Sequence, residues 1–168
     1  MRIGLFTDSF LPIVDGVGRV VHNYARTMPS KGHECYVVAP MSNAGYLGDT
    51  PYELLEFLSI EVPTQRQYST GIPTLDAHYR ERIRRIPLDI VHAHSPFLAG
   101  REALFIARRK KIPVVGTFHS RYYDDFYKLT KMDVAANIGV KYIVDFYNRC
   151  DEVWAVSESS SQALHEYG

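Results

Sequence analysis

Three histidines stand where the apolar runs of this chain give way to polar residues. His92 and His94 lie two residues apart at the end of one run, and His119 follows another directly in Thr-Phe-His-Ser. An imidazole can donate or accept a proton near neutral pH and also binds metals. His119 is therefore our first candidate for a catalytic or acceptor-binding side chain, and a helix-capping or loop histidine is the alternative.

The spacing of His92 and His94 allows three interpretations. Residues two apart on a regular strand point to the same face, so both rings would emerge together. Such a pair could contact a polar substrate, be structural, or begin a metal site. A metal-assisted hydrolase would need more ligands. His119, Asp124 and Asp125 are available, but the chain has neither an H-E-x-x-H motif nor a cysteine pair.

A second candidate site is the sequence Asp15-Gly16-Val17-Gly18, which opens a segment with helical periodicity. The N–H groups and the dipole of a helix N-terminus attract phosphate, and glycine lets a ligand approach the backbone. The chain has no G-x-G-x-x-G motif and no P-loop with its lysine. The motif therefore indicates either a phosphate site or a plain turn.

These residues belong to a repeated pattern of apolar run, polar turn and helical segment, which predicts βαβ units on a parallel sheet. Ligands of such sheets bind beyond the carboxyl ends of the strands, so the candidate residues should share one edge. We expect strands at residues 2–6, 33–39, 88–94, 113–118 and 152–156. The first helix should begin at residue 17 and stop at 30–32. Further helices are expected at 75–85, 98–111 and 134–148, and after residue 157.

Two segments stand apart from this pattern. Residues 41–73 predict a long irregular insertion with one strand near 57–62. The helix expected at 75–85 is rich in cations, which is typical of a solvated helix face or of a surface that contacts phosphates or an anionic membrane. The cations are Arg80, Arg82, Arg84 and Arg85.

Composition narrows the class of protein. A length of 168 residues fits one domain. Lys and Arg total 19, as do Asp and Glu, so there is no global basic field and nucleic acid is not expected as a partner. Cys35 and Cys150 are too far apart for a disulfide framework or a zinc site and favour reduced thiols in a cytoplasmic protein. The sequence shows neither a signal peptide nor an apolar run of about 20 residues, the length that spans a membrane.

Four segments, in order and over nearly the whole chain, resemble the landmarks of the N-terminal domain of family 4 retaining glycosyltransferases. They are RIGLFTDSFLPIVDGVGR, DIVHAHSPFLAG, IPVVGTFHS and EVWAVSESSSQALHEYG. Within the family, the sequences of these segments resemble the branch of diacylglycerol glucosyltransferases and phosphatidylinositol mannosyltransferases. The resemblance implies an α/β fold, a Rossmann-like open parallel sheet with helices on both faces, as the N-terminal half of a glycosyltransferase B fold. It also implies that residues 1–168 are the acceptor-side domain and that the C-terminal nucleotide-sugar-binding domain is absent from this chain.

The resemblance further implies roles for individual residues. Gly16 matches the family glycine whose backbone approaches the donor diphosphate, and His119 matches the histidine that reaches the reaction centre. Asp15 and His94 occupy loop positions where the family lines its acceptor pocket. The family often has two adjacent glycines where this chain has Asp15 and Gly16, which loosens the expected contact with phosphate.

The implied function is transfer of a sugar from a nucleotide-sugar donor to a hydroxyl of a lipid or glycan acceptor, with retention of the anomeric configuration. No metal and no cofactor are expected, because the nucleotide-sugar is a co-substrate. With a lipid acceptor the enzyme would be peripheral on the inner face of the cell membrane. The isolated chain would be inactive, since half the cleft is absent. The alternatives are a metal-assisted hydrolase using His92, His94 and His119, and a non-catalytic nucleotide- or sugar-binding module.

Overall fold

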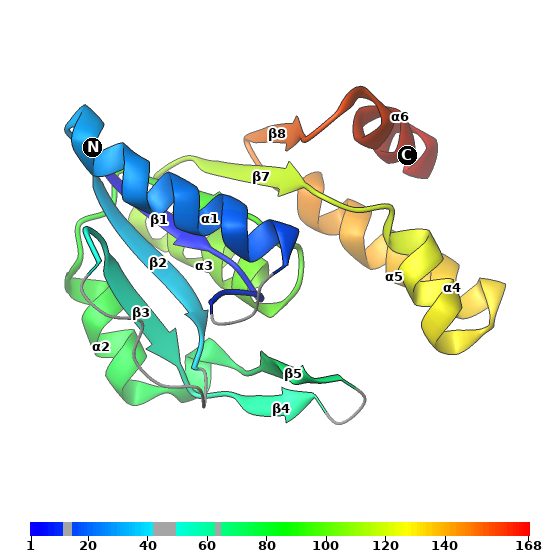
Figure 1. Ribbon diagram of the computed structural model, residues 1–168, viewed down its shortest axis with the longest axis horizontal. Coiled ribbons are helices and arrows are strands. Elements are labelled where there is room, and N and C mark those ends of the chain that lie inside the picture. Colours follow the sequence, from blue (N-terminus) through cyan, green and yellow to red (C-terminus); the bar gives the residue numbers. More distant parts are fainter. Residues whose placement is uncertain (12–14, 42–49, 63–64) are drawn as a thin grey trace.

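A computed structural model describes residues 1–11, 15–41, 50–62 and 65–168 (Figure 1). Within these ranges the chain forms a six-stranded parallel sheet with helices around it. Across the sheet the strands are β3 (Glu53–Phe57), β2 (Glu34–Pro40), β1 (Arg2–Phe6), β6 (Ile90–Ala93), β7 (Val114–Phe118) and β8 (Glu152–Ala155). The helices are α1 (Gly16–Thr27), α2 (Ala77–Arg85), α3 (Leu98–Lys110), α4 (Tyr122–Thr130), α5 (Asp133–Tyr147) and α6 (Glu158–Tyr167).

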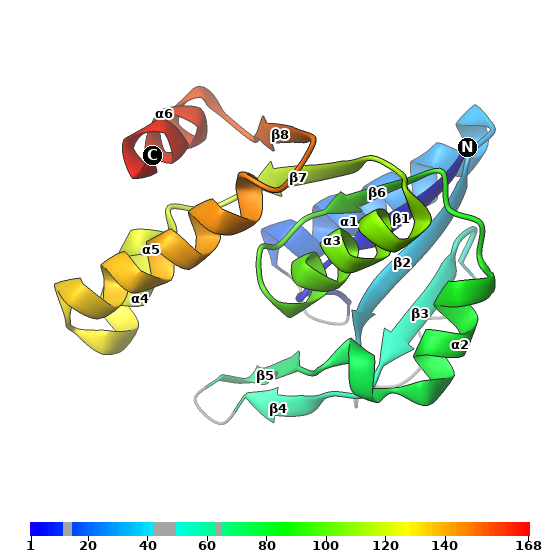
Figure 2. The ribbon, with the colours of Figure 1, turned by 180° about the vertical axis from the view of Figure 1, so that it is seen from behind.

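Helices cover both faces of the sheet, as the sequence predicts. Because side chains alternate along a strand, Leu5 of β1 packs toward α1 while its neighbour Phe6 packs into a second core on the opposite face. Figure 1 shows α1 in front of the strands, and the view from behind in Figure 2 shows α3 and α5 on the other side. The Rossmann-like α/β class is therefore confirmed.

The prediction of an irregular insertion at residues 41–73 is wrong for the part that the structure describes. Residues of this segment form β3, which pairs in parallel with β2, and an antiparallel hairpin of β4 (Ile60–Val62) and β5 (Gln65–Thr70). The strand expected near 57–62 is thus divided between two elements. Leu55 and Phe57 are fully buried, which explains why β3 joins the sheet. Residues 42–49 and 63–64 lie outside the described ranges.

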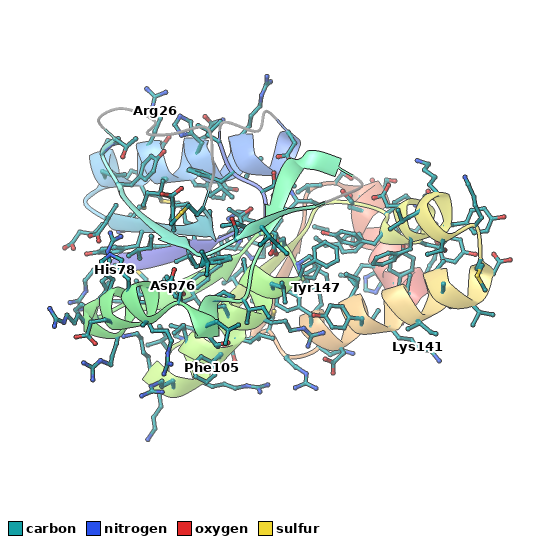
Figure 3. The ribbon with its side chains drawn as sticks, turned by 90° about the horizontal axis from the view of Figure 1, so that it is seen from below. Arg26, Asp76, His78, Phe105, Lys141 and Tyr147 are labelled. Atoms are coloured by element: carbon teal, nitrogen blue, oxygen red, sulfur yellow. The ribbon has the colours of Figure 1, made fainter. Side chains whose placement is uncertain are left out.

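At the ends of the elements one local prediction holds and another is off by two residues. The first helix ends in a short 3-10 turn, Met28–Lys31, and Gly32 follows with a φ of 81°, a conformation that glycine adopts without strain. The helix expected from residue 75 starts instead at Ala77, because Asp76 caps it by accepting the N–H of Tyr79. Asp76, labelled in Figure 3, also accepts the N–H of Leu58 and so ties the base of the hairpin to α2.

The strand order places a reversal between β1 and β6. The chain builds β1, β2 and β3 in one direction across the sheet, and then returns to lay β6, β7 and β8 on the other side of β1. At such a reversal the connecting helices leave in opposite directions and open a crevice at the carboxyl ends of the strands. The loops after β1, β6 and β7, which carry the candidate residues, meet there.

Candidate functional site

Three imidazoles gather at the carboxyl ends of β6 and β7, and we call His92, His94 and His119 the histidine cluster. The rings of His92 and His94 are stacked with their centroids 4.0 Å apart, which confirms that they share one face. The ring of His119 lies next to them, with its centroid 5.5 Å from that of His94. Tyr24 of α1 covers His94 edge-on at 5.6 Å.

His92 is held by the neighbouring strand. A hydrogen bond of 2.6 Å joins its Nε2 to the hydroxyl of Thr117 on β7, and the Trp154 ring of β8 packs edge-on at 5.0 Å. Burial, with a smaller contribution from the charge of His119, lowers the pKa of His92 to about 4. These contacts favour the structural interpretation of His92.

The metal-assisted hydrolase receives no support from this arrangement. A metal needs several ligand lone pairs directed at one point. Nε2 of His92, however, is hydrogen-bonded to Thr117, and Nδ1 of His94 is hydrogen-bonded to His119. In the part of the chain that the structure describes, no group of three or more His, Cys, Asp or Glu side chains is arranged to hold a metal ion.

His94 is sealed inside the protein, with 0% of its surface exposed. Its Nδ1 lies 3.2 Å from Nε2 of His119, while its own Nε2 is buried and has no hydrogen-bond partner among the described residues. Burial first, and then the charges of His92 and His119, put the pKa of His94 well below its ordinary value. His94 therefore reaches the site through His119 rather than through its own surface.

His119 is the partly exposed member of the cluster. Burial lowers its pKa from the ordinary value, and the negative charge of Asp15 partly opposes this effect. Asp15 is the N-cap of α1, since its carboxylate accepts the N–H of Gly18 at 2.7 Å and the hydroxyl of Ser9. The structure thus brings the turn before α1 and His119, two features predicted from distant parts of the sequence, into one electrostatic neighbourhood.

The two glycines of this turn serve different purposes. Gly16 is the first residue of α1, and a Cβ added to it would meet no atom of the described residues within 4 Å, so the described structure leaves space beside its backbone for a ligand. A Cβ on Gly18 would lie 3.2 Å from an oxygen of Asp15 and 3.4 Å from the backbone of Phe10, so close packing explains that glycine. The preceding loop residues 12–14 lie outside the described ranges.

Asp8 couples the loops of the site, a role that the sequence did not reveal. Its carboxylate accepts the Ser95 hydroxyl at 2.6 Å and the N–H of Ala99 at 3.0 Å, at the start of α3. Its own N–H donates to the Ser95 oxygen at 2.9 Å. Burial raises the pKa of Asp8, and these hydrogen bonds oppose the rise. The loop after β1 is thereby fixed to the loop that carries His94.

Helix α5 holds the end of β7 from the opposite face of the sheet. Tyr147, which points inward in Figure 3, donates its hydroxyl to the carbonyl of Thr117 at 3.0 Å. Gly116, one residue earlier, lets this helix approach, because a Cβ there would lie 2.9 Å from the sulfur of Cys150 and 3.2 Å from the ring of Tyr147. Both cysteines are free, and burial raises the pKa of Cys150 to about 12.

The fold and the site define a Rossmann-like α/β domain whose polar residues gather at the switch point of a parallel sheet. The chain belongs to Glycosyltransferase Family 4, whose family model matches residues 14–168. The family predicted from the four sequence segments is confirmed by this match.

The chain is similar to curated monoglucosyldiacylglycerol synthases and mannosyltransferases. It is 29% identical over 132 residues to an alpha-monoglucosyldiacylglycerol synthase of Acholeplasma laidlawii, covering 79% of this chain and 33% of the relative. A synthase of the same name from Streptococcus pneumoniae is 29% identical over 99% of this chain and 38% of its own. A GDP-mannose-dependent alpha-mannosyltransferase of Corynebacterium glutamicum is 27% identical over 100% of this chain and 41% of its own. The chain therefore spans about a third to two fifths of the length of these relatives.

Proposed function

We propose that this chain is the acceptor-side N-terminal domain of a retaining glycosyltransferase that moves a sugar from a nucleotide-sugar to a hydroxyl of a lipid or glycan. Membership of the family supports the transfer chemistry, and the names of the relatives support lipid and mannose-containing substrates. The observation that carries the proposal is the placement of His119 within the electrostatic reach of the Asp15-Gly16 turn at the switch point. In this proposal a second domain completes the donor site.

The residues of this chain suit the two charges that such a reaction develops. Departure of the diphosphate leaves positive charge on the sugar carbon and adds negative charge to the leaving group, so positioned donors would lower the barrier. The N-terminal turn of α1 offers backbone N–H groups and its dipole beside the open Gly16. His119, neutral near pH 7 because burial lowers its pKa, can hydrogen-bond a sugar hydroxyl or a phosphate oxygen.

The surface around α2 suits a peripheral contact with the inner face of the cell membrane. Most of its arginines are already paired: Arg82 with Glu53, and Arg84 and Arg85 with Glu81. Just before the helix, Ile72 and Leu75 leave 51% and 74% of their surfaces exposed. Exposed apolar side chains flanked by cations are typical of interfacial anchors. In the described ranges no helix is both long and apolar enough to cross a membrane.

Transfer is tested with the full-length protein encoded by the gene, assayed against a panel of nucleotide-sugars with lipid and soluble acceptors. We expect transfer with one donor class and a loss of about 10²- to 10³-fold in kcat/KM for His119→Ala, the cost of removing a transition-state hydrogen-bond donor. His165→Ala, at an exposed histidine of α6, is the control. Binding of nucleotide-sugar without turnover, or hydrolysis of the donor without an acceptor, would contradict the proposal.

Membrane contact is tested by sedimentation with vesicles of phosphatidylglycerol or of phosphatidylcholine alone. Leu75→Asp should reduce binding to the anionic vesicles, because it places a negative charge among the exposed apolar residues. Leu129→Asp is a matched control, since Leu129 on α4 is 66% exposed and lies on a different element. An effect of the control as large as that of Leu75→Asp would move the contact away from α2.

A further inference from the structure

The two ring nitrogens of His94 have unlike surroundings. Nδ1 lies 3.2 Å from Nε2 of His119, within hydrogen-bond distance, whereas Nε2 of His94 is buried with no partner in the described part of the chain. A neutral imidazole has one N–H donor and one lone pair, and burial keeps this ring neutral by holding its pKa far below the ordinary value. The unpartnered nitrogen is therefore either a buried donor or a buried acceptor.

The energies of these two states differ. With the proton on Nε2, His94 would leave an N–H buried without an acceptor, which is rare in folded proteins and costs about 1–3 kcal/mol. With the proton on Nδ1, that N–H donates to His119 and the buried atom is a bare lone pair, which proteins tolerate more readily. His94 is therefore assigned the Nδ1–H form.

The form of His94 determines the form of its partner. Nε2 of His119 must accept, so the neutral ring of His119 carries its proton on Nδ1, which makes no hydrogen bond with the described residues. Protonation of His119 at Nε2 would set two N–H groups against each other unless His94 moved its own proton to the buried side. Both outcomes cost free energy, so the pair resists a positive charge on His119.

Other side chains around His94 and His119 also influence the charge on the two rings. Asp15, from the N-cap of α1, favours a charged His119, and His92 on β6 disfavours a charged His94. Tyr24 faces His94 from α1 as an aromatic edge. The carboxylate of Asp15 already accepts from Gly18 and Ser9, so much of its hydrogen-bonding capacity serves the helix cap.

We propose that His94 is a positioning residue that fixes His119 as a neutral ring with its Nδ1–H available to an oxygen of the ligand. His119 then recognises a hydroxyl or phosphate oxygen by donating a hydrogen bond, and it does not act as the acid that transfers a proton. The identity of the ligand rests on the proposed function, but the ring forms of His94 and His119 do not.

The test is NMR of the 168-residue chain labelled with ¹⁵N-histidine, in which long-range ¹H–¹⁵N correlations report the protonated nitrogen of each ring. Wild-type protein should show Nδ1–H on both His94 and His119, with His119 titrating below the ordinary value of 6.5. In His94→Leu, His119 should become a mixture of both ring forms and titrate closer to 6.5. His92→Leu is the matched control, because His92 belongs to the same stack but has no bond with His119.

Two results would overturn the inference: a proton on Nε2 of His119 in the wild type, or equal changes in His119 caused by the His92 and His94 variants. If His94→Leu does not fold, the wild-type spectra alone still decide. In the full-length enzyme, the acid limb of the kcat/KM profile should move to higher pH in His94→Leu. If the spectra match the prediction but the full-length protein has no transferase activity, the proposed function is refuted and this inference stands. If the protein is active but its histidines have the other ring forms, this inference is refuted and the proposed function stands.

Discussion

The face of the sheet that carries α1 has two unlike halves. In the aliphatic half, Leu5 of β1 and Val37 of β2 pack under Val21 of α1. In the histidine half, His92 of β6 bonds to Thr117 of β7 at the same depth in the sheet. Leu5 and His92 are direct partners in the strand register, so the change from apolar packing to imidazole occurs across a single strand pair. That pair is also the point where the strand order reverses.

The aliphatic half stabilises the fold, whereas the histidine half supplies side chains of the candidate site. Helix α1 serves both halves, since Val21 and Ala25 pack in the aliphatic half while Tyr24 covers the histidine rings. The aliphatic half stabilises the fold by burying apolar side chains, which need no hydrogen-bond partners. The histidine half buries groups that water would otherwise solvate, and it leaves Nε2 of His94 without a partner among the described residues. Perturbed titratable groups of this kind gather at functional sites.

The largest effect should come from the aliphatic half. Leu5 is 1% exposed, so Leu5→Ala removes buried methyl groups and leaves a cavity, at a cost of about 2–5 kcal/mol in the free energy of unfolding. Urea unfolding at pH 7.5 measures this loss. The ring form of His119 should stay as in the wild type. A loss below about 1 kcal/mol would mean that this half does not hold the fold.

Acid should weaken the protein through the histidine half. An unfolded histidine titrates near 6.5, whereas folded His92 titrates at about 4, so the unfolded state binds more protons between these values. Stability should therefore fall as the pH drops from 6.5 toward 4, by at most about 1.4 kcal/mol per pH unit for this residue. Urea unfolding at several pH values gives the slope. His92→Leu should flatten it and His165→Gln should not, and equal slopes in all three proteins would remove His92 as the cause.

Sequence patterns predicted those features of the two halves that depend on residues close together in the chain. The spacing of two placed His92 and His94 on one face, and the periodic segments located α1, α3 and β7 closely. Edge strand β3 was missed because it follows a run with scattered glycine and proline, and its burial depends on pairing with β2. Helix α4 was not predicted either, and α5 packs against it.

The side-chain contacts of the site depend on pairs far apart in the chain. His94 and His119 are separated by 25 residues, and Asp8 and Ser95 by 87, so no local period reports either hydrogen bond. Strand order and register create them, and both are consequences of the whole fold. Sequence alone therefore supplied the residue types of the site but neither their ring forms nor their partners.

A pair of glycine substitutions separates packing from ligand access. In Gly100→Ala the new Cβ would collide with the carbonyl oxygen of Ser95, next to the loop that carries His94, so we expect a loss of about 1–3 kcal/mol in unfolding free energy. In Gly16→Ala the Cβ meets no atom of the part of the chain that the structure describes within 4 Å, so stability should change by less than about 0.5 kcal/mol. In the full-length enzyme, Gly16→Ala should nevertheless raise the KM for the donor. An unchanged KM would remove Gly16 from the donor site.

The smallest effect is optical and reports on the histidine half directly. Trp154 is the single tryptophan of the chain, and its ring centre lies 5.0 Å from that of His92, with 44% of its surface exposed. An imidazolium quenches a neighbouring indole, so the fluorescence should fall with a midpoint at about 4, where His92 becomes charged. Circular dichroism on the same samples separates this quenching from unfolding, and His92→Leu should abolish it. A midpoint near 6.5 in folded protein would show that His92 remains solvated, and the histidine half would then not bury its imidazoles as the aliphatic half buries its side chains.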